Sequence, residues 1–293
     1  MTRPFAEYDL ADWGHLRPVM HGLKSLRYRL VDRRYRRRPA HAGDPAAVAR
    51  AVTGKRLLTT IAFADAESID WQARLMAHYL PGIALLIADN SPDDESAGAI
   101  GAVARARGLP YLRLPANPWR GPSRSHGVAL NWVWHNVVRP GRPEAFGFLD
   151  DDIFPTGPDD PFEALRSQDF YGVVRPGGSR WFLWAGFCVF RFAAVADKDL
   201  DFGQDWFKGL DTGGGNWRSL YRHVDRGSIR EAATDYRPFK PGIEMEEAPL
   251  QWCGAWLHEV GLMGKDELRA EKRRAVVAIL APHLAAASGE AAR

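Results

Sequence analysis

Cysteine is scarce in this chain, with only Cys188 and Cys253 among 293 residues. Two cysteines build neither a disulfide framework nor a four-cysteine zinc site, so the sequence predicts a reducing, cytoplasmic location. The chain also lacks any run of about 18 uninterrupted apolar residues, which argues against a membrane-spanning helix. Its first residues, MTRPFAEYDLADWGHL, lack the basic-then-apolar layout of a secretory signal. With 46% hydrophobic and 26% charged residues, the composition excludes collagen, coiled coil and wholesale disorder.

Positive charge is concentrated near the N-terminus. Residues 21–38 hold eight Lys or Arg against one acid, Asp32, a net +7 in a chain whose total is +3. Leu23, Leu26 and Leu30 recur there at helical spacing, which predicts a basic amphipathic helix. Such a helix either contacts an anionic membrane surface or packs onto the domain through its leucines. Nucleic acid is not the partner expected, because few aromatic residues interleave with the basic ones.

Apolar strand-like runs alternate with amphipathic helical stretches from residue 57 onward. Because the connections are short, this order predicts an α/β fold with a mostly parallel sheet and helices on both faces. Ligands of such sheets bind beyond the carboxyl ends of the strands. The predicted strands are 57–63, 83–90, 109–115 and 145–155, and the predicted helices are 68–82, 95–108 and 125–138.

The amino-acid pattern changes from about residue 157, where the second half of the chain begins. Aromatic-rich runs at 171–178 and 181–192 predict antiparallel strands, and a helix and tail close the chain. The sequence therefore divides into a basic helical extension (1–54), a central domain (55–265) with halves 55–156 and 157–265, and a C-terminal helix with its tail (266–293). The tryptophans of the second half fit an aromatic core, or platforms on which sugars stack.

The string FGFLDDDIFP is the most informative in the chain. Three consecutive carboxylates directly after an apolar strand repel one another unless something cationic compensates. Alternate side chains of an extended segment share a face, so Asp150 and Asp152 point one way and Asp151 the other. Two carboxylates on one face suit a hard divalent cation such as Mg²⁺ or Mn²⁺, with phosphate oxygens as further ligands. An acidic surface turn or a helix N-cap would give the same triplet.

Four strings in this order resemble the GT-A nucleotide-sugar glycosyltransferases, and most closely their large family-two group of mostly inverting enzymes. They are TIAFADAES, LLIADNSPDDES, GPSRSHGVALNW and FGFLDDDIF, and they cover residues 57–155. The third string departs from the usual A-R-N-x-G of the family, because Ser125-His126-Gly127 stands at that site. His126 is therefore open to a capping or packing role as well as a ligand role.

The resemblance implies a donor site for a nucleoside diphosphate-sugar. Ala64 and Asp65 would lie against the base, and Asp89 would bind base or ribose, although Asp89-Asn90-Ser91 is also a good turn and helix cap. Arg124 would pair with a phosphate. Asp150 and Asp152 match the family's DxD pair, which contacts the ribose and a Mn²⁺ or Mg²⁺ ion.

The resemblance also implies a base and a closing ligand from the second half. Asp211, followed by Thr and three glycines, is the first candidate for the base, although it could equally cap a turn. Glu244, Glu246 and Glu247 are the second candidates. His258 is the candidate third metal ligand, unless it is a satisfied core histidine. Trp184 is the candidate sugar platform, with room for a sugar provided by Gly186.

The sequence thus predicts a metal-dependent glycosyltransferase of hexosyltransferase type, acting with inversion on a saccharide or lipid-linked acceptor. Two other functions remain open. A sugar-nucleotide pyrophosphorylase shares the fold and the metal, but TIAFADAES contains no glycine for its phosphate loop. An inactive scaffold could instead serve as a membrane-peripheral interaction module through residues 21–38.

Overall fold

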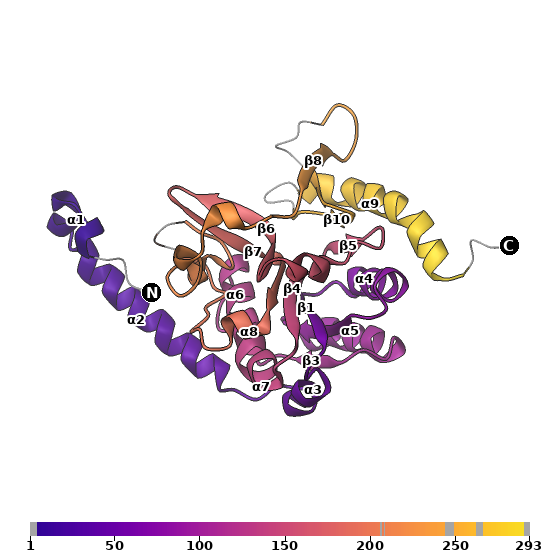
Figure 1. Cartoon of the computed structure of the whole chain (residues 1–293), viewed down its shortest axis with the longest axis horizontal. Coiled ribbons are helices and arrows are strands. Elements are labelled where there is room, and N and C mark those ends of the chain that lie inside the picture. The colour runs from indigo at the N-terminus through magenta and orange to yellow at the C-terminus, as the bar shows by residue number, and fades with distance from the viewer. Residues whose placement is uncertain (1–4, 206, 208, 244–248, 262–265, 290–293) are drawn as a thin grey trace.

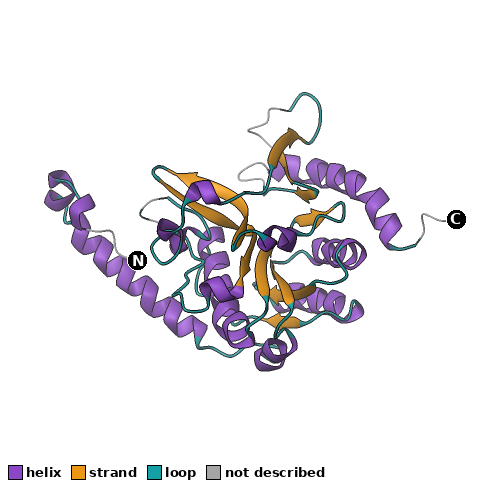
Figure 2. Ribbon diagram, viewed as in Figure 1, coloured by secondary structure: helices purple, strands orange, loops and turns teal. Residues whose placement is uncertain are grey.

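A computed structural model of the chain describes residues 5–205, 207, 209–243, 249–261 and 266–289. Its centre is a six-stranded sheet of order β3-β2-β1-β4-β7-β6 (Figures 1 and 2). The first four strands are parallel, and β7 and β6 continue the sheet antiparallel. The strands are β1 (Arg56–Ala62), β2 (Ala84–Asp89), β3 (Tyr111–Arg113), β4 (Ala145–Asp150), β6 (Phe170–Gly177) and β7 (Arg180–Arg191).

Helices cover both faces of this sheet, because successive apolar residues of a strand point to opposite sides. Leu57 of β1 packs in the same core cluster as Val128 and Trp132 of α6, whereas Leu58 packs with Ile69 of α4. The sequence prediction of an α/β fold is therefore confirmed. The covering helices are α3 (Pro45–Ala51), α4 (Ala66–Tyr79), α5 (Asp94–Ala106), α6 (Pro122–Val133) and the short α7 (Arg139–Gly141) and α8 (Phe192–Val195).

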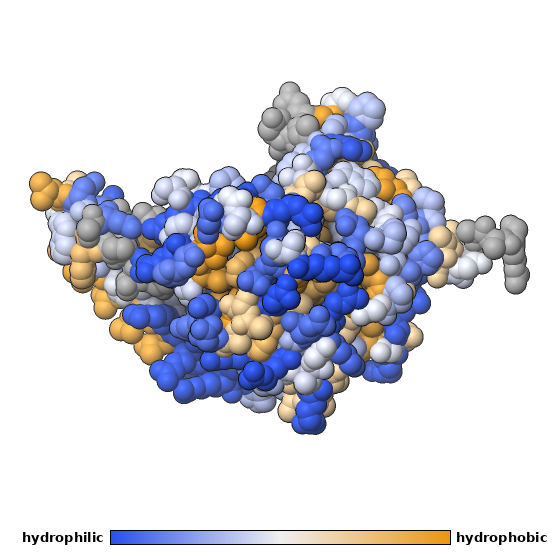
Figure 3. Space-filling view, in the orientation of Figure 1, coloured by the Kyte–Doolittle hydropathy of each residue, from blue (hydrophilic) through white to orange (hydrophobic). Residues whose placement is uncertain are grey.

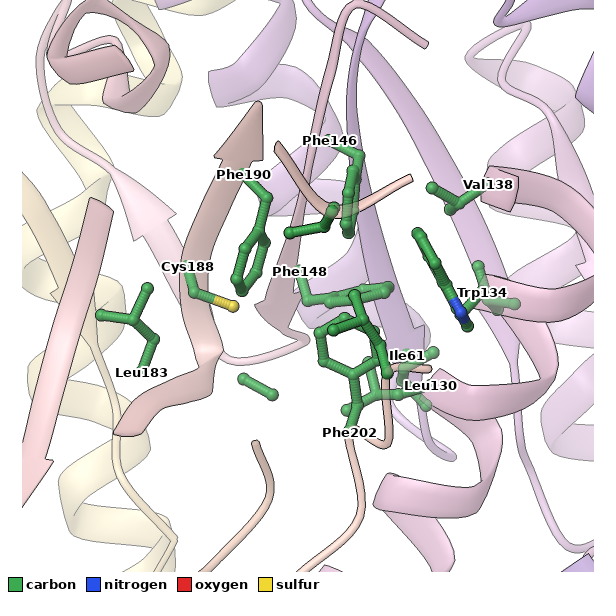
Figure 4. Close-up of a cluster of buried hydrophobic side chains, with 14 of the residues drawn as sticks. Ile61, Leu130, Trp134, Val138, Phe146, Phe148, Leu183, Cys188, Phe190 and Phe202 are labelled. Atoms are coloured by element: carbon green, nitrogen blue, oxygen red, sulfur yellow. The ribbon is translucent and has the colours of Figure 1, made fainter. Parts of the chain in front are cut away.

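Aromatic rings fill the core between α6 and the middle of the sheet (Figure 4). Phe146 of β4 stacks on Phe190 of β7, with ring centroids 5.2 Å apart, and Phe148 meets Phe202 edge to face at 4.8 Å. These contacts hold the last residues of β4 in a rigid setting. Many of the aromatic residues noted in the sequence thus build this core.

A second sheet of order β5-β10-β9-β8 lies beyond the end of β4. Its antiparallel strands are β5 (Ile153–Pro155), β8 (Thr234–Pro238), β9 (Pro249–Cys253) and β10 (Trp256–His258). The C-terminal helix α9 (Asp266–Ala287) joins it, as Val276 and Leu280 pack with Phe154 and Leu257. The strand predicted over 145–155 is therefore two strands, because the turn at Asp151–Asp152 moves the chain from one sheet to the other.

The N-terminal extension forms α1 (Leu10–Gly14) and the long α2 (Arg17–Arg36), which runs along one flank of the domain (Figure 1). Tyr35 is 1% exposed and donates to the carbonyl of Pro115, and Tyr28 packs edge to face on Trp119. The predicted basic helix is present, but its leucines do not pack onto the domain. Among the described residues, none of the helices has the length and apolar character needed to cross a bilayer.

The helix predicted over 125–138 begins earlier, at Pro122, and turns π-helical over Trp134–Val138. The side-chain amide of Asn136 donates to the backbone carbonyls of Trp132 and Arg36, so it supplies hydrogen-bond donors at this turn. That second bond joins this turn to the end of α2. The two cysteines are free and buried.

Candidate functional site

Polar residues gather where β2, β1 and β4 end side by side. Ala62 pairs with Asp89, and Ile61 pairs with Asp150, so the three strands end at one edge of the sheet. Side-chain bonds connect the ends: the amide of Phe63 donates to Asp151 (2.7 Å), and the amide of Ala64 donates to the hydroxyl of Ser91 (3.0 Å). Ala64 has a φ of 55°, a left-handed conformation that non-glycine residues rarely adopt, and such strain concentrates at functional sites.

Asp150, Asp152 and His258 form a compact cluster at this edge. Each offers one ligand atom, and these atoms all lie within 4.8 Å of one another. The Nε2 atom of His258 is 3.2 Å from Asp152 Oδ1. It is the one group of three or more such side chains found in the part of the chain that the structure describes. The tertiary structure thus brings together the three residues that the sequence predicts as metal ligands, and their binding of a metal stays a prediction.

The second sheet positions His258. Because β10 pairs antiparallel with β5, His258 lies opposite Ile153, next to the acidic turn. Its Nδ1 is 3.0 Å from the amide oxygen of Gln251, which has no exposed surface. An amide oxygen only accepts, so Nδ1 carries a proton, and Nε2 is the nitrogen that faces Asp152. Trp184 packs on the imidazole, with ring centroids 4.9 Å apart.

Hydrogen bonds from neighbouring elements hold the backbone of the acidic turn in place. The buried amide of Gln72, on α4, donates to the carbonyls of Asp150 (3.0 Å) and Ile153 (2.9 Å). The backbone amide of Glu259 donates to the carbonyl of Asp152 at 3.0 Å. The backbone of the turn is therefore fixed by α4 and by the residue that follows β10, which leaves the Asp150 and Asp152 carboxylates for a ligand.

The electrostatics of the turn favour a bound cation. Burial raises the pKa of Asp150, an effect that His126 opposes and Asp152 reinforces. Burial also acts to raise the pKa of Asp152, but the neighbouring His258 outweighs it, and the pKa of Asp152 is lowered. Burial and the two flanking carboxylates together hold the pKa of Asp151 well above its usual range. Without an added cation, the three neighbouring carboxyl groups repel one another too strongly for all three to be ionised at once.

The residues fit a divalent metal on geometric grounds as well. Asp150 Oδ1 is a buried acceptor without a hydrogen-bond partner among the described residues, and His126 Nδ1 lies 3.6 Å from it. Such an orphaned carboxylate oxygen in a native site calls for an ion or water. Two carboxylate oxygens and one imidazole nitrogen suit Mn²⁺ and accommodate Mg²⁺.

Asp89 and Asp65 are both held by hydrogen bonds. Asp89 is 1% exposed; its oxygens accept from the amide of Ser91 (2.8 Å) and the hydroxyl of Tyr111 (2.6 Å). Asp65 caps α4 through the amide of Ser68 (3.0 Å) and pairs with Arg273 of α9 at 2.7 Å. Both lie at the expected edge, where they shape the two turns, and their contact with base or ribose stays a prediction.

The side chains of Arg124 and His126, both on α6, point to different sides of that helix. Arg124 pairs with Asp32 of α2, and its guanidinium lies 4.1 Å from the centroid of the Tyr28 ring. The phosphate contact predicted for Arg124 stays untested, but in this structure its charge is already used to fasten the N-terminal extension. His126 faces the acidic turn instead, and its Nε2 is buried without a hydrogen-bond partner among the described residues.

Asp211 is exposed and lies in the loop that follows Leu210. It is close enough to contribute to the raised pKa of Asp150, behind burial, His126, Asp152 and His258. Its Oδ1 accepts from the amide of Thr212 at 2.8 Å. Gly213 allows this loop to lie against β7, because a Cβ there would sit 2.2 Å from the carbonyl of Leu183. Glu244, Glu246 and Glu247 lie outside the described residues.

The room expected at Gly186 is already filled. A Cβ on Gly186 would lie 2.1 Å from the indole of Trp184, which is itself 7% exposed. The expectation that Gly186 leaves space for a sugar is therefore wrong, because the glycine accommodates Trp184. Trp184 still lies at the candidate site, because its ring packs on His258.

Sequence reasoning missed Phe63 and Gln251. Phe63 is 52% exposed at the end of β1, although it continues an otherwise buried strand. An apolar residue directly before Ala64-Asp65 at a strand end was the available signal. Gln251 gave no signal, because its importance depends on a pairing between β9 and β10.

Solved structures similar to this chain are glycosyltransferases, the group that the sequence resembles. A mannosyltransferase from Pyrobaculum calidifontis, in complex with GDP-Man and Mn²⁺, matches 59% of this chain with 15% identity and a TM-score of 0.37. TarS from S. aureus, in complex with UDP-GlcNAc, matches 54% with 16% identity and a TM-score of 0.37. Glucosyl-3-phosphoglycerate synthase from Mycobacterium tuberculosis, in complex with Mn²⁺, UDP and phosphoglyceric acid, matches 84% with 14% identity and a TM-score of 0.45.

This chain spans about half of the mannosyltransferase chain (53%) and about half of the TarS chain of residues 1–349 (51%), and 84% of the synthase chain. No family model and no curated protein sequence matches it. At identities of 14–16%, the activity has to be argued from this chain's own residues.

Proposed function

We propose that this protein transfers a sugar from a nucleoside diphosphate-sugar to an acceptor hydroxyl with the help of a divalent metal. The observation that carries the proposal is the cluster of Asp150, Asp152 and His258 at the carboxyl edge of a parallel sheet. Nucleotide ligands of open α/β sheets bind at this edge. The orphaned Asp150 oxygen and the crowded carboxylates supply the reason for a cation.

The donor side is formed by residues 55–156. Asp150, Asp152 and His258 would hold Mn²⁺ or Mg²⁺, which when bound neutralises the charge of the diphosphate leaving group. The exposed ring of Phe63 offers a stacking surface for the nucleobase. Ala64 and Asp65 lie beside it at the end of β1, and Asp89 holds the turn that carries Ser91.

The acceptor side is formed by residues 157–265, and Asp211 is the proposed base. The acceptor hydroxyl attacks the anomeric carbon as the bond from that carbon to the diphosphate oxygen breaks. The hydroxyl proton passes to the Asp211 carboxylate, and the nucleoside diphosphate leaves with the electron pair. Attack on the face opposite the leaving group inverts the configuration of the sugar. Two observations support this role: Asp211 is exposed, and it lies near enough to Asp150 to contribute to the raised pKa of that residue.

The acceptor is a saccharide or a lipid-linked saccharide, and nucleic acid is not proposed as a partner. A lipid-linked acceptor requires work at a membrane surface, for which the basic segment 21–38 is the candidate. Hexosyl transfer is proposed as the reaction type.

Thermal unfolding with a panel of nucleoside diphosphates, each with and without Mn²⁺, tests the proposal. Ligand at about 100 times its dissociation constant stabilises the folded state by about 2.7 kcal/mol, which raises the melting temperature measurably. We expect one diphosphate to give a shift that needs Mn²⁺. A flat response to every nucleotide would favour an inactive scaffold. A shift only with a nucleoside triphosphate, and release of pyrophosphate from it when a sugar 1-phosphate is supplied as the attacking group, would favour a pyrophosphorylase.

A further inference from the structure

The N-terminal extension carries an unpartnered apolar face. Side chains of residues 5–30 are 45–90% exposed at nine large hydrophobic positions, and the rest of the described chain adds only Phe63 and Val277 to this class. The positions are Phe5, Leu10, Trp13, Leu16, Val19, Met20, Leu23, Leu26 and Leu30. Apolar side chains gain free energy when they leave water, so an exposed face of this size calls for a covering surface.

The exposed residues of α2 share one side of the helix. The spacing of Leu16, Val19, Met20, Leu23, Leu26 and Leu30 follows the helical period, so they form a stripe along α2. The opposite side, with Ser25, Tyr28 and Asp32, holds the helix to the domain: Asp32 pairs with Arg124 and accepts from the Trp119 indole at 2.8 Å. The helix is thus anchored by its polar side and turns its leucines outward. Figure 3 shows hydrophobic residues along this outer edge, where Figure 1 places α1 and α2.

Basic side chains border the stripe. Arg27, Arg33 and Arg34 are exposed on the second half of α2, and no carboxylate of the described residues pairs with them. The acids of the extension are used elsewhere. Glu7 pairs with Arg180, Asp12 with Arg17 and Asp32 with Arg124, and Asp9 caps the start of α1. The face therefore presents an apolar stripe and a positive charge that the protein itself leaves uncompensated.

We propose that α1 and α2 dock this face on an anionic lipid bilayer. The leucine stripe would enter the boundary between headgroups and acyl chains, and the arginines would contact lipid phosphates. A second copy of the chain fits less well, because it would bring the same positive charges into the interface. A nucleic acid would satisfy the arginines and leave the leucines in water.

The anchoring contacts give this docking a consequence for the reaction. Arg124, which holds Asp32, is two residues from His126, which faces Asp150. Arg180, which holds Glu7, also holds Asp205 in the segment leading to Asp211, and His21 packs on Phe207 of that segment. A membrane-bound extension is therefore joined by direct contacts to the helix that carries His126 and to the segment that leads to Asp211. Resting on the proposed function, this arrangement assigns the acceptor to the lipid-linked class.

Vesicle co-sedimentation of the full chain tests the docking without any substrate. Vesicles of phosphatidylcholine alone are compared with phosphatidylcholine containing a minority of phosphatidylglycerol. We expect binding to the anionic vesicles, weakened by salt. The variant L23Q/L26Q/L30Q should lose it, whereas V277Q, at an exposed apolar position of α9, should keep it. The variant R33Q/R34Q should lower the partition to anionic vesicles about thirtyfold. R105Q, at an exposed arginine of α5, should not.

Several outcomes would overturn the docking. They are no binding to either vesicle, equal binding by wild type and L23Q/L26Q/L30Q, or a dimer in light scattering that this variant abolishes without any lipid binding. Thermal unfolding of each variant shows that the fold is kept. Mn²⁺-dependent nucleotide binding by L23Q/L26Q/L30Q, together with vesicle binding by D152N, separates failure of the docking from failure of the proposed reaction.

Discussion

His258 Nε2 lies 3.2 Å from Asp152 Oδ1, although the two residues are 106 positions apart in the sequence. Asp152 precedes β5, and His258 ends β10, the partner of β5. The candidate metal site therefore requires the first sheet to deliver Asp150 and the second to deliver His258. Folding of residues 249–258 onto β5 completes the ligand set.

Replacement of either metal-facing carboxylate should abolish metal dependence. We expect D150N and D152N to lower transferase activity by at least about a hundredfold, because leaving-group stabilisation by a metal contributes several kcal/mol. Calorimetric Mn²⁺ titration in the presence of nucleotide measures the binding loss directly.

D151N is the matched control from the same turn. Asp151 faces away and accepts from the amide of Phe63, which an Asn oxygen can also do, and its raised pKa already favours a neutral group. Equal loss of Mn²⁺ binding in D151N and D152N would contradict the assignment.

Gln251 should tune the metal affinity through His258. Its oxygen fixes the imidazole, and loss of such a partner typically weakens metal binding by about 10–100-fold. We expect Q251L to show this loss and Q251E, which keeps the acceptor, to retain most of the affinity. Mn²⁺ titration of the two variants decides, and a wild-type affinity in Q251L would mean that His258 does not bind the metal.

Asp211 should matter for the rate and not for donor binding. A general base contributes roughly 10²–10⁴-fold, so D211N should lower kcat by that factor. Its nucleotide-dependent melting shift should equal that of wild type, because Asp211 is not in the metal cluster. An unchanged kcat would return the search for the base to the Glu244–Glu247 segment.

Phe63 should contribute to donor affinity by stacking. Base–aromatic stacking contributes about 1–3 kcal/mol, so F63A should raise the donor KM by roughly 5–150-fold. F63Y, which keeps the ring, should restore it. Phe63 is 52% exposed, so neither change should lower the melting temperature much. Steady-state kinetics with varied donor give the answer, and an unaltered KM in F63A would place the base elsewhere.

Lys272 should make stability rise with alkaline pH. It has no exposed surface, and its ammonium donates to the carbonyls of Pro249 and Val260 at 2.7 Å each. Burial lowers its pKa from 10.5 to about 8, although Glu259 and Asp152 oppose the shift. Between these values the unfolded chain binds more protons, so the free energy of unfolding increases with pH, by up to about 1.4 kcal/mol per unit.

Denaturant unfolding at pH 8 to 10 measures this slope. K272M lacks the titrating group and should show a smaller rise than wild type, whatever its absolute stability. Parallel slopes for the two proteins would mean that Lys272 keeps its proton throughout this range.

The periodicity of the sequence was enough for the parallel half of the fold. The strands predicted over 57–63 and 83–90 are continuous apolar runs, as expected for strands that are covered on both faces. The observed β2 lies within its predicted bounds, and β1 begins one residue earlier than predicted, at Arg56, and ends at Ala62. The ends of helices were less certain. Pro122 extended α6 at its start, and Asn136 supports a π-helical turn that no pattern indicates.

The local sequence also identified the acidic turn, because alternation along an extended strand separates Asp150 and Asp152 from Asp151. Only the tertiary structure decided what surrounds it. Gln72, Gln251 and Glu259 reach the turn through packing of α4 and the second sheet, and long-range packing leaves no local periodicity to read.

The N-terminal helix shows the same division. Its charge and leucine spacing determined that α2 is amphipathic and basic, but not which side the domain would cover. That depended on Trp119 and Arg124, which bind Asp32 and draw the polar side inward. Helical spacing defines two faces of a segment, and the complementary groups elsewhere in the fold select the one that is buried.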